Sequence, residues 1–245
     1  MSSSYLTGST NSDLSAGELT TALAELEREE ERLMGSLAVR DPYFWMTQCT
    51  KTRDEQHPVP YKPFPDKPYI RLVLNYLLHE GSPVRIIKKS RTMMASWTVS
   101  AWAAHFCFTR PATRAVFQSQ DERRAVTDIE YCKELWKNSL PVLKEQWPVA
   151  KAIEKQAAHE LEMANGSVMV AISRDPNAIR SAHPSIVVLD EAAFLEQGEE
   201  SYNTAIASKC LFLVALSSAH PGWFADMTGA SLPVPFPAFE QVRSG

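Results

Sequence analysis

Residues Ile186 to Leu189 are all apolar, three of them β-branched, and they run directly into two acids, Asp190 and Glu191. An apolar run without polar alternation is typical of a strand buried on both faces of a sheet. Similar short runs recur along the chain, separated by segments of helical length. The other main predicted strands are 84–87, 115–118, 167–172 and 211–216, and the predicted helices between them are 97–108 and 122–136. This alternation predicts an α/β fold with a mostly parallel central sheet flanked by helices.

The length and composition limit the number of domains and the kind of surface. At 245 residues the chain exceeds one average domain of roughly 150 residues but does not reach two. The hydrophobic share of 44% is enough for a large core. We therefore expect one α/β domain over residues 41–232, with an extension at each end. The formal net charge of −4 argues against a chain that coats nucleic acid by bulk charge, although local patches could still bind phosphate.

The two extensions differ from the domain in composition. Residues 1–40 are expected to hold a flexible Ser/Thr-rich start and a helix over Gly17–Met34 that carries six glutamates and two arginines. We interpret this charged face as solvated, or alternatively as a docking helix for a partner. Residues 233–245 begin with a Pro-rich stretch that we interpret as a linker toward a further domain.

The start of the domain contains both helical and irregular segments. Aromatic-rich residues 41–49 predict a short buried helix, and apolar spacing predicts another over 69–79. Between them, residues 51–68 contain five prolines, so we expect an irregular segment. Further along, Asn165-Gly166 predicts a tight hairpin turn between residues 160–163 and the strand 167–172.

Several classes of site and location lack their sequence signatures. The four cysteines have no C-x-x-C spacing and the six histidines no H-x-x-x-H spacing, so neither a zinc site nor a disulfide scaffold is expected. No G-x-S-x-G elbow indicates hydrolase chemistry of the serine type. No apolar run approaches the roughly 20 residues that span a bilayer, and we expect no membrane partner.

The acids after Leu189 form the strongest local signal. Asp190 could hold Mg²⁺, which prefers hard oxygen ligands, and Glu191 could orient and deprotonate a water. A buried strand ending in two such acids is the Walker B pattern of P-loop ATPases. The alternative is that the two acids only terminate a buried strand.

A second signal lies between the predicted strand 84–87 and the helix that follows. The strict phosphate-loop motif G-x-x-x-x-G-K-[ST] is absent, since Met94 and Ala95 stand where Gly and Lys are usual. Ser96 could still supply the hydroxyl that holds Mg²⁺, and the cation would come from Lys89, with Lys88 and Arg91 as weaker candidates. The predicted nucleotide-binding residues are Lys88, Lys89, Ser90, Arg91, Thr92, Met93, Met94, Ala95, Ser96 and Trp97. The alternative is a basic turn that binds DNA or nothing.

Together these segments resemble large terminase subunits, the ATPases that drive viral DNA into preformed capsids. The residues 89–97 are similar to a deviant Walker A motif in which the lysine stands at the front of the loop and Ser or Thr eight positions into it. Residues 63–69 and 190–194 are also similar to that family, and the resemblance runs from about 41 to 224. It implies a P-loop NTPase of the RecA-like, additional-strand class, with an extra strand between the two nucleotide-binding strands.

The resemblance also implies roles for further residues. Ser217 and Ser218 look like the coupling motif that senses loss of the γ-phosphate. Arg180, in an expected loop 11 residues before Glu191, looks like the arginine finger supplied to a neighbouring subunit, with Arg174 as a rival. The alternative is that an arginine in such a loop is only solvated. For the adenine, stacking is expected on an upstream aromatic residue. The matching stretch holds Tyr61, Phe64 and Tyr69, of which Tyr61 or Phe64 is expected to stack. The alternative is that these aromatic residues belong to the core.

The implied function is that of a Mg²⁺-dependent ATPase motor that translocates double-stranded DNA. The implied partners are DNA, copies of the chain in a ring, the portal protein and the small terminase subunit, in the host cytoplasm at the capsid portal. Large terminases continue into a nuclease domain, and we expect no nuclease activity in these residues. The rival functions are another nucleic-acid-dependent ATPase such as a helicase core, or a catalytically dead DNA- or partner-binding module.

Overall fold

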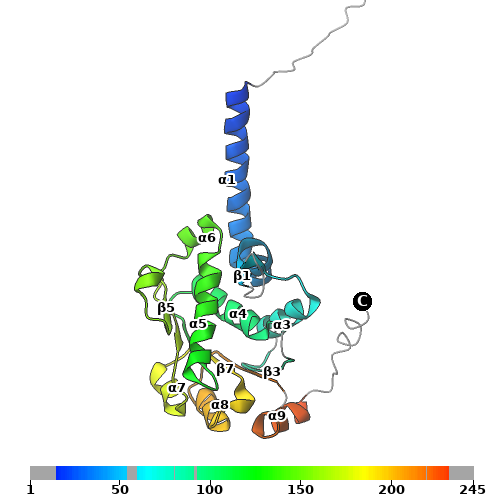
Figure 1. Cartoon of the computed structure of the whole chain (residues 1–245), viewed down its shortest axis with the longest axis vertical. Helices are drawn as coiled ribbons and strands as arrows, with labels where there is room; N and C mark the ends of the chain where they lie inside the picture. The colour runs from blue at the N-terminus through cyan, green and yellow to red at the C-terminus, as the bar shows by residue number, and fades with distance from the viewer. Residues whose placement is uncertain (1–14, 54–59, 80, 91–92, 219, 232–245) are drawn as a thin grey trace, which may run out of the picture.

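A computed structural model describes residues 15–53, 60–79, 81–90, 93–218 and 220–231 (Figure 1). The helices are α1 (Ala16–Arg40), α2 (Pro42–Phe44), α3 (Pro68–His79), α4 (Ala95–Thr109), α5 (Glu122–Lys137), α6 (Pro141–Gln146), α7 (Pro176–Ala182), α8 (Gly198–Ala207) and α9 (Trp223–Ser231). Shorter π or 3₁₀ turns are η1 (Trp45–Cys49), η2 (Ile153–Lys155) and η3 (Ala192–Phe194). The strands are β1 (Lys51–Arg53), β2 (Tyr61–Pro63), β3 (Val84–Lys88), β4 (Arg114–Gln118), β5 (Glu160–Glu162), β6 (Val168–Ala171), β7 (Ile186–Asp190) and β8 (Phe212–Ser217).

The central sheet has six strands in the order β3-β8-β7-β4-β6-β5. All neighbours pair in parallel except β5, which pairs with β6 in an antiparallel hairpin across Asn165-Gly166. Gly166 has a φ of 81°, a left-handed conformation that glycine adopts without strain. Strand β8, late in the chain, lies between β3 and β7. The predicted fold class, with its additional strand between the two candidate ligand-binding strands, is therefore confirmed.

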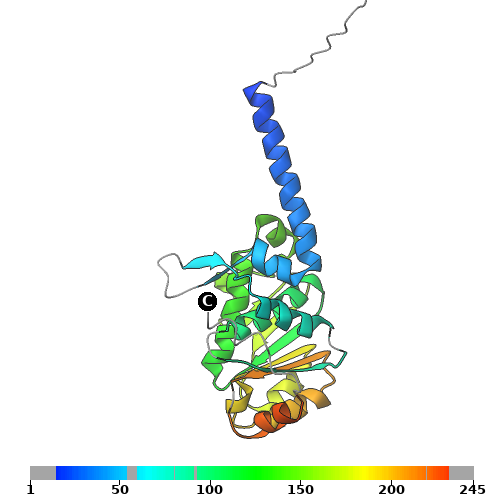
Figure 2. The same cartoon turned by 90° about the vertical axis from the view of Figure 1, so that its right-hand side faces the viewer.

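Helices cover the sheet on both faces, as the apolar strands require (Figure 2). Alternate residues of β7 divide between two apolar cores. Ile186 and Val188 join the larger core, which includes α4 and α5, while Val187 and Leu189 join the smaller core on the side of α7 and α8. Burying each such side chain contributes roughly 1.5–3 kcal/mol. The strand is thereby held firmly enough to fix the position of the acids that follow it.

The first part of the domain differs from the sequence-based expectation. The Pro-rich segment 51–68 is not wholly irregular, because β1 and β2 pair antiparallel in a small sheet of their own. Pro63 is the last residue of β2 and lies opposite Lys51 of β1. Its missing N–H is tolerated at the end of so short a ladder. The buried helix expected at 41–49 is confirmed as α2 and η1. The predicted helix Gly17–Met34 extends to Arg40, whereas the flexible start and the Pro-rich linker lie outside the described residues.

Helices α6 to α9 were not predicted from the sequence. Helix α7 matters most, because it contains Arg180, which we expected in a loop. Asp175 caps α7 by accepting from the Asn177 N–H at 2.9 Å, and Pro176 occupies the first turn. Within the described residues no helix combines the length and the apolar character needed to cross a membrane.

Candidate functional site

Three neighbouring strands bring the candidate residues to one edge of the sheet. β3, β8 and β7 run parallel, so their carboxyl ends lie side by side, where ligands bind in open α/β sheets. The backbone N–H of Lys89, just after β3, donates to the Ser217 carbonyl at the end of β8 at 2.9 Å. Asp190, the last residue of β7, pairs with Leu216 of β8. The register therefore places the end of the loop strand beside the two acids.

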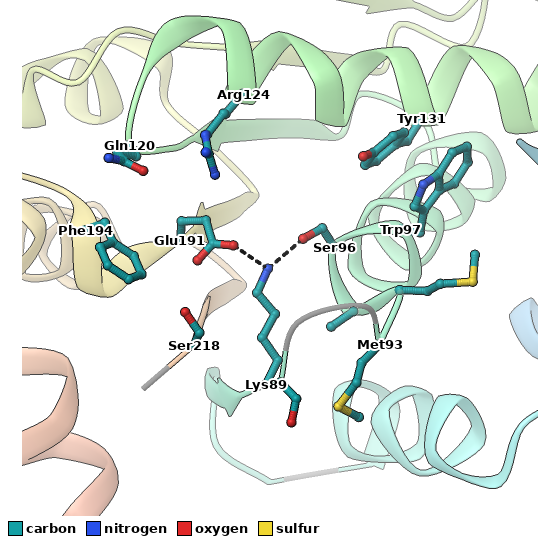
Figure 3. A pocket seen from close by; sticks show the side chains of 13 residues that line it. Lys89, Met93, Ser96, Trp97, Gln120, Arg124, Tyr131, Glu191, Phe194 and Ser218 are labelled. Carbon is teal, nitrogen blue, oxygen red and sulfur yellow. Dashed lines mark hydrogen bonds and ion pairs between the residues drawn. The ribbon is translucent and has the colours of Figure 1, made fainter. Parts of the chain in front are cut away.

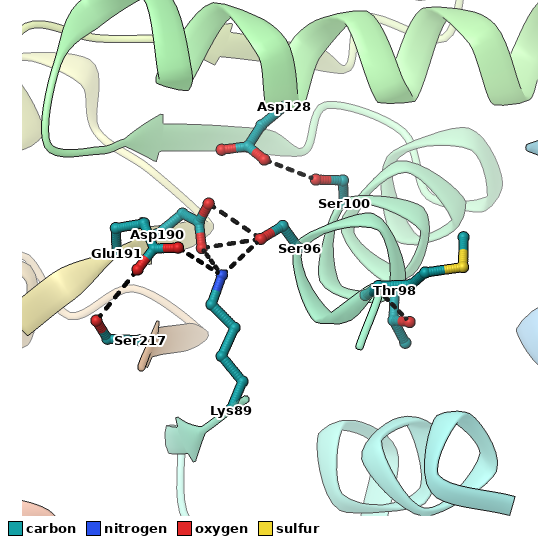
Figure 4. A network of polar contacts seen from close by, with 9 residues as sticks. Lys89, Ser96, Thr98, Ser100, Asp128, Asp190, Glu191 and Ser217 are labelled. Carbon is teal, nitrogen blue, oxygen red and sulfur yellow. Dashed lines mark hydrogen bonds and ion pairs between the residues drawn. The ribbon is translucent and has the colours of Figure 1, made fainter. Parts of the chain in front are cut away.

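The amine of Lys89 lies at the centre of a polar cluster (Figure 4). Its Nζ is 3.0 Å from Asp190 Oδ1 and 3.1 Å from Glu191 Oε1, and it donates to Ser96 Oγ at 2.8 Å. Ser96 Oγ in turn lies 3.1 Å from each carboxylate oxygen of Asp190. Lys89 and Asp190 are 101 positions apart in the sequence. The loop lysine and the two acids, which the sequence singles out separately, thus converge in the fold.

Burial and charge act in opposite directions on Lys89. Burial disfavours the charged amine, but the attraction of Asp190, followed by that of Glu191, outweighs it and raises the pKa of Lys89 above its ordinary value. The amine is therefore protonated at neutral pH and neutralises part of the carboxylate charge. An incoming anion would compete with the two carboxylates for this cation.

A second buried acid lies close to this cluster. Asp128 on α5 accepts a hydrogen bond from Ser100 Oγ at 3.4 Å, and its Oδ2 has no hydrogen-bond partner among the described residues. Burial, followed by the negative charge of Asp190, raises the pKa of Asp128 well above its ordinary value. The raised pKa favours the protonated form of Asp128, which brings no further negative charge to the two acids at the end of β7.

The backbone at the site is strained at two non-glycine residues. Met94 and Glu191 both have a φ of 51°, a left-handed conformation that costs a side chain on the order of 1 kcal/mol or more. Met94 immediately precedes α4, and among the described residues no side chain caps that helix. The first N–H groups of α4 can therefore face another acceptor. Such uncapped helix starts attract phosphate and other anions.

A cavity of about 540 Å³ lies over the cluster (Figure 3). This is within the usual range for small-molecule sites, roughly 300–1,000 Å³. The loop and the start of α4 form one wall, and α5 forms the opposite wall. The lining residues are Lys89, Ser90, Met93, Met94, Ala95, Ser96, Trp97, Gln120, Arg124, Tyr131, Glu191, Phe194 and Ser218.

The oxygens at the site fit Mg²⁺ that arrives with a phosphorylated ligand. Among the described residues no group of three or more His, Cys, Asp or Glu side chains could hold a metal ion. Ser96 and Asp190 nevertheless bring three hard oxygens together, because Ser96 Oγ lies 3.1 Å from each carboxylate oxygen of Asp190. Mg²⁺ is commonly held by one or two protein oxygens, with phosphate and water completing its shell.

Comparison with solved structures identifies the fold. No family model matches the sequence, and no curated protein matches it either. The large terminase ATPase domain of Thermus phage P74-26 aligns with a TM-score of 0.52 over 73% of this chain and 74% of that chain, at 17% sequence identity. This chain has the fold of a large terminase ATPase domain. A large terminase from a thermophilic bacteriophage, in complex with ADP, aligns with a TM-score of 0.43 over 64% of this chain and 39% of that one, at 14% identity.

The terminase-like fold gathers most, but not all, of the residues singled out from the sequence. Of the predicted nucleotide-binding residues, Lys88 is exposed and does not line the cavity, and residues 91–92 lie outside the described part of the chain. Ser218 lines the cavity, and the buried Ser217 donates to Glu191 Oε2 at 3.4 Å. Arg180 is exposed on α7 and is absent from the lining.

The aromatic residues expected to stack on adenine lie elsewhere. Phe64 is buried and packs edge-to-face on Trp97, with ring centroids 6.5 Å apart. Tyr61 lies on β2 and Tyr69 on α3, and neither lines the cavity. Arg174, the rival candidate for the arginine finger, is also exposed, and its Nη1 lies 3.8 Å from Glu196 Oε2.

Four lining residues were missed in the sequence: Gln120, Arg124, Tyr131 and Phe194. Gln120 and Arg124 follow the carboxyl end of β4, and Phe194 follows that of β7. The rule that ligands bind beyond these strand ends was the signal that could have found them. Tyr131 stacks on Trp97 with centroids 4.0 Å apart and planes at 21°.

Proposed function

We propose that this chain is the ATP-hydrolysing motor domain of a viral DNA-packaging machine. The observation that carries the proposal is the convergence of Lys89, Ser96, Asp190 and Glu191 beneath one cavity at the carboxyl edge of the sheet. The fold, that of a large terminase ATPase domain, supports the same conclusion. A triphosphate in this cavity would meet a cation, an uncapped helix start and two acids.

The loop and α4 would bind the phosphates. Lys89 would transfer its hydrogen bonds from Asp190 and Glu191 to phosphate oxygens, and the first N–H groups of α4 would donate to the same group. Ser96 and Asp190 would hold Mg²⁺, which when bound neutralises charge on the phosphates. Movement of the Lys89 amine from the carboxylates to the phosphates would free Asp190 to hold Mg²⁺.

Glu191 would act on the attacking water. Once Lys89 has moved to the phosphates, the Glu191 carboxylate is free to accept a proton from a water positioned toward the γ-phosphate. Ser217 would hold the orientation of Glu191 through its hydrogen bond to Oε2. Ser218, which lines the cavity at the end of β8, would report loss of the γ-phosphate to that strand.

Arg180 would act in trans on the nucleotide of a neighbouring copy in a ring. Its exposed position on α7, outside the cavity of its own chain, supports a role between subunits rather than within one. Arginine fingers of this kind increase hydrolysis by roughly 10³ to 10⁵. The ring would grip double-stranded DNA through its backbone and cooperate with the portal protein and the small terminase subunit, at the capsid portal in the host cytoplasm.

Mixing two inactive variants tests this proposal. Glu191→Gln and Arg180→Ala should each abolish Mg²⁺-dependent ATP hydrolysis by the concentrated protein with DNA. Their mixture should regain activity, because some interfaces then join an intact Glu191 to an intact Arg180. Arg174→Ala, a matched exposed arginine, should keep normal activity.

Two results would count against the proposal. Full hydrolysis by purified Glu191→Gln would remove that residue from catalysis. Failure of the folded wild-type chain to bind Mg²⁺-ATP at millimolar concentration would favour a catalytically dead module, for which Met94 and Ala95 in place of Gly-Lys are the structural argument.

A further inference from the structure

Helix α1 projects from the body of the protein, and within the described part of the chain it is anchored at its C-terminal end alone (Figures 1 and 2). At that end Ala38 is buried and its carbonyl accepts from the Nε2–H of the buried His105 at 2.8 Å. Gly35 packs closely against Val142 of α6. The 25 residues of α1 would extend about 37 Å, so most of the helix lies beyond these contacts.

Five leucines form a stripe along the projecting helix. The leucine seam comprises Leu19, Leu23, Leu26, Leu33 and Leu37. Their spacings of 4, 3, 7 and 4 residues follow the alternating three-and-four repeat of a coiled-coil seam. Each leucine is between 49% and 67% exposed. A row of apolar side chains at this spacing is suited to cover by another helix.

The charges beside the seam are all negative. Glu30 stands at the position where the repeat would place a sixth leucine, and Glu27 and Glu29 occupy the two flanking positions next to it. Arg28 and Arg32 fall on the outer side of the helix in this repeat. Arg32 is paired there with Glu29 through a 2.7 Å contact.

This charge pattern opposes pairing of α1 with a second copy of itself. The three glutamates lie near the middle of α1, so both an in-register parallel pair and a centred antiparallel pair would bring them together. Like charges facing each other across such a seam disfavour the pair, whereas opposite charges select it. Lysine or arginine on the facing helix would complement the glutamates.

We propose that the leucine seam is a docking site for one α-helix of a different protein, lined by leucine-type residues and flanked by lysine or arginine. The apolar seam supplies the contact area, and the Glu27–Glu30 stretch selects a basic partner and sets its register. Most of α1 extends away from β3 and α4 (Figure 1), the elements that flank the loop of the nucleotide cavity, so the docking site is independent of the catalytic proposal.

A synthetic peptide tests the proposal with the full chain. The probe is a fluorescent four-heptad helix with leucine at the seam positions and lysine at the flanking ones, and binding is measured by anisotropy. Leu26→Gln and Leu33→Gln should each weaken binding at least tenfold. Leu72→Gln should leave it unchanged, since Leu72 is a similarly exposed leucine on α3, outside the seam (47% exposed). Circular dichroism should show the same helicity in all four proteins.

Charge provides the second arm of the experiment. A peptide with glutamate at the flanking positions should bind at least tenfold more weakly, and added salt should weaken only the lysine peptide. Equal binding of the two peptides, or unchanged binding by the seam variants, would overturn the proposal. A wild-type dimer in sedimentation equilibrium that Leu26→Gln dissociates would also overturn it, because the occupant would then be a second copy.

Discussion

Replacing Lys89 by methionine should destabilise the protein even without nucleotide. Methionine keeps most of the aliphatic length but leaves Asp190 and Glu191 without their cation. At an effective dielectric of about 20, each contact near 3 Å amounts to roughly 5 kcal/mol of gross attraction, most of which offsets the desolvation of the charges. Removing one partner of a buried pair costs about 3–5 kcal/mol. Since the Glu191 side chain is 20% exposed, we expect the lower end, about 3 kcal/mol.

That loss corresponds to a decrease in melting temperature of about 6–12 °C for a domain of this size. Thermal unfolding by circular dichroism, in buffer without nucleotide or divalent cation, measures it. Lys88→Met is the matched control, because Lys88 is the exposed last residue of β3, next to Lys89, and it should melt within about 2 °C of wild type. Adding Asp190→Asn to Lys89→Met should recover part of the loss. A Lys89→Met protein that melts with the wild type would refute the view that this amine compensates the two carboxylates.

Three further variants test other parts of the site and fold. Arg124→Ala should weaken binding of a Mg²⁺-ATP analogue roughly tenfold, since its guanidinium lines the cavity opposite the loop; equal weakening by the adjacent exposed Arg123→Ala would contradict this. Ser217→Ala should lower the hydrolysis rate several-fold with unchanged nucleotide affinity, because it frees Glu191 to rotate; a change in affinity alone would speak against that role. Burial lowers the pKa of His105 to about 4 from an ordinary 6.5, so its contribution to stability is complete above pH 6.5 and is lost as pH falls toward 4, by on the order of 3 kcal/mol. Urea unfolding should show that His105→Gln flattens this decline; an unchanged pH profile would exclude His105 as its cause.

Much of the fold follows from local sequence signals. The central strands are short apolar, β-branched runs, and sheets buried on both faces need such runs whatever their order. The acids after Leu189 and the basic loop before α4 were recognisable because each motif is contiguous. The additional strand was expected only from the family resemblance, since strand order depends on which apolar edges meet in space.

The other parts depend on tertiary structure or on weak local signals. Gln120 and Arg124 become part of the site only because β4 lies beside β7, which brings the start of α5 over the loop. Arg180 was expected in a loop, although Asp175-Pro176 before it is a recognisable helix start. The helical spacing of Leu19, Leu23, Leu26 and Leu33 can be read from the sequence, but the sequence does not show that the helix leaves the body of the protein.

Binding of a non-hydrolysable ATP analogue with Mg²⁺, measured by isothermal titration calorimetry, tests the central claim most directly. We predict that the wild type and Lys88→Ala bind with the same affinity and that Lys89→Ala binds at least tenfold more weakly. Equal affinity of Lys89→Ala and wild type would contradict the claim that a triphosphate replaces Asp190 and Glu191 as the partner of this lysine.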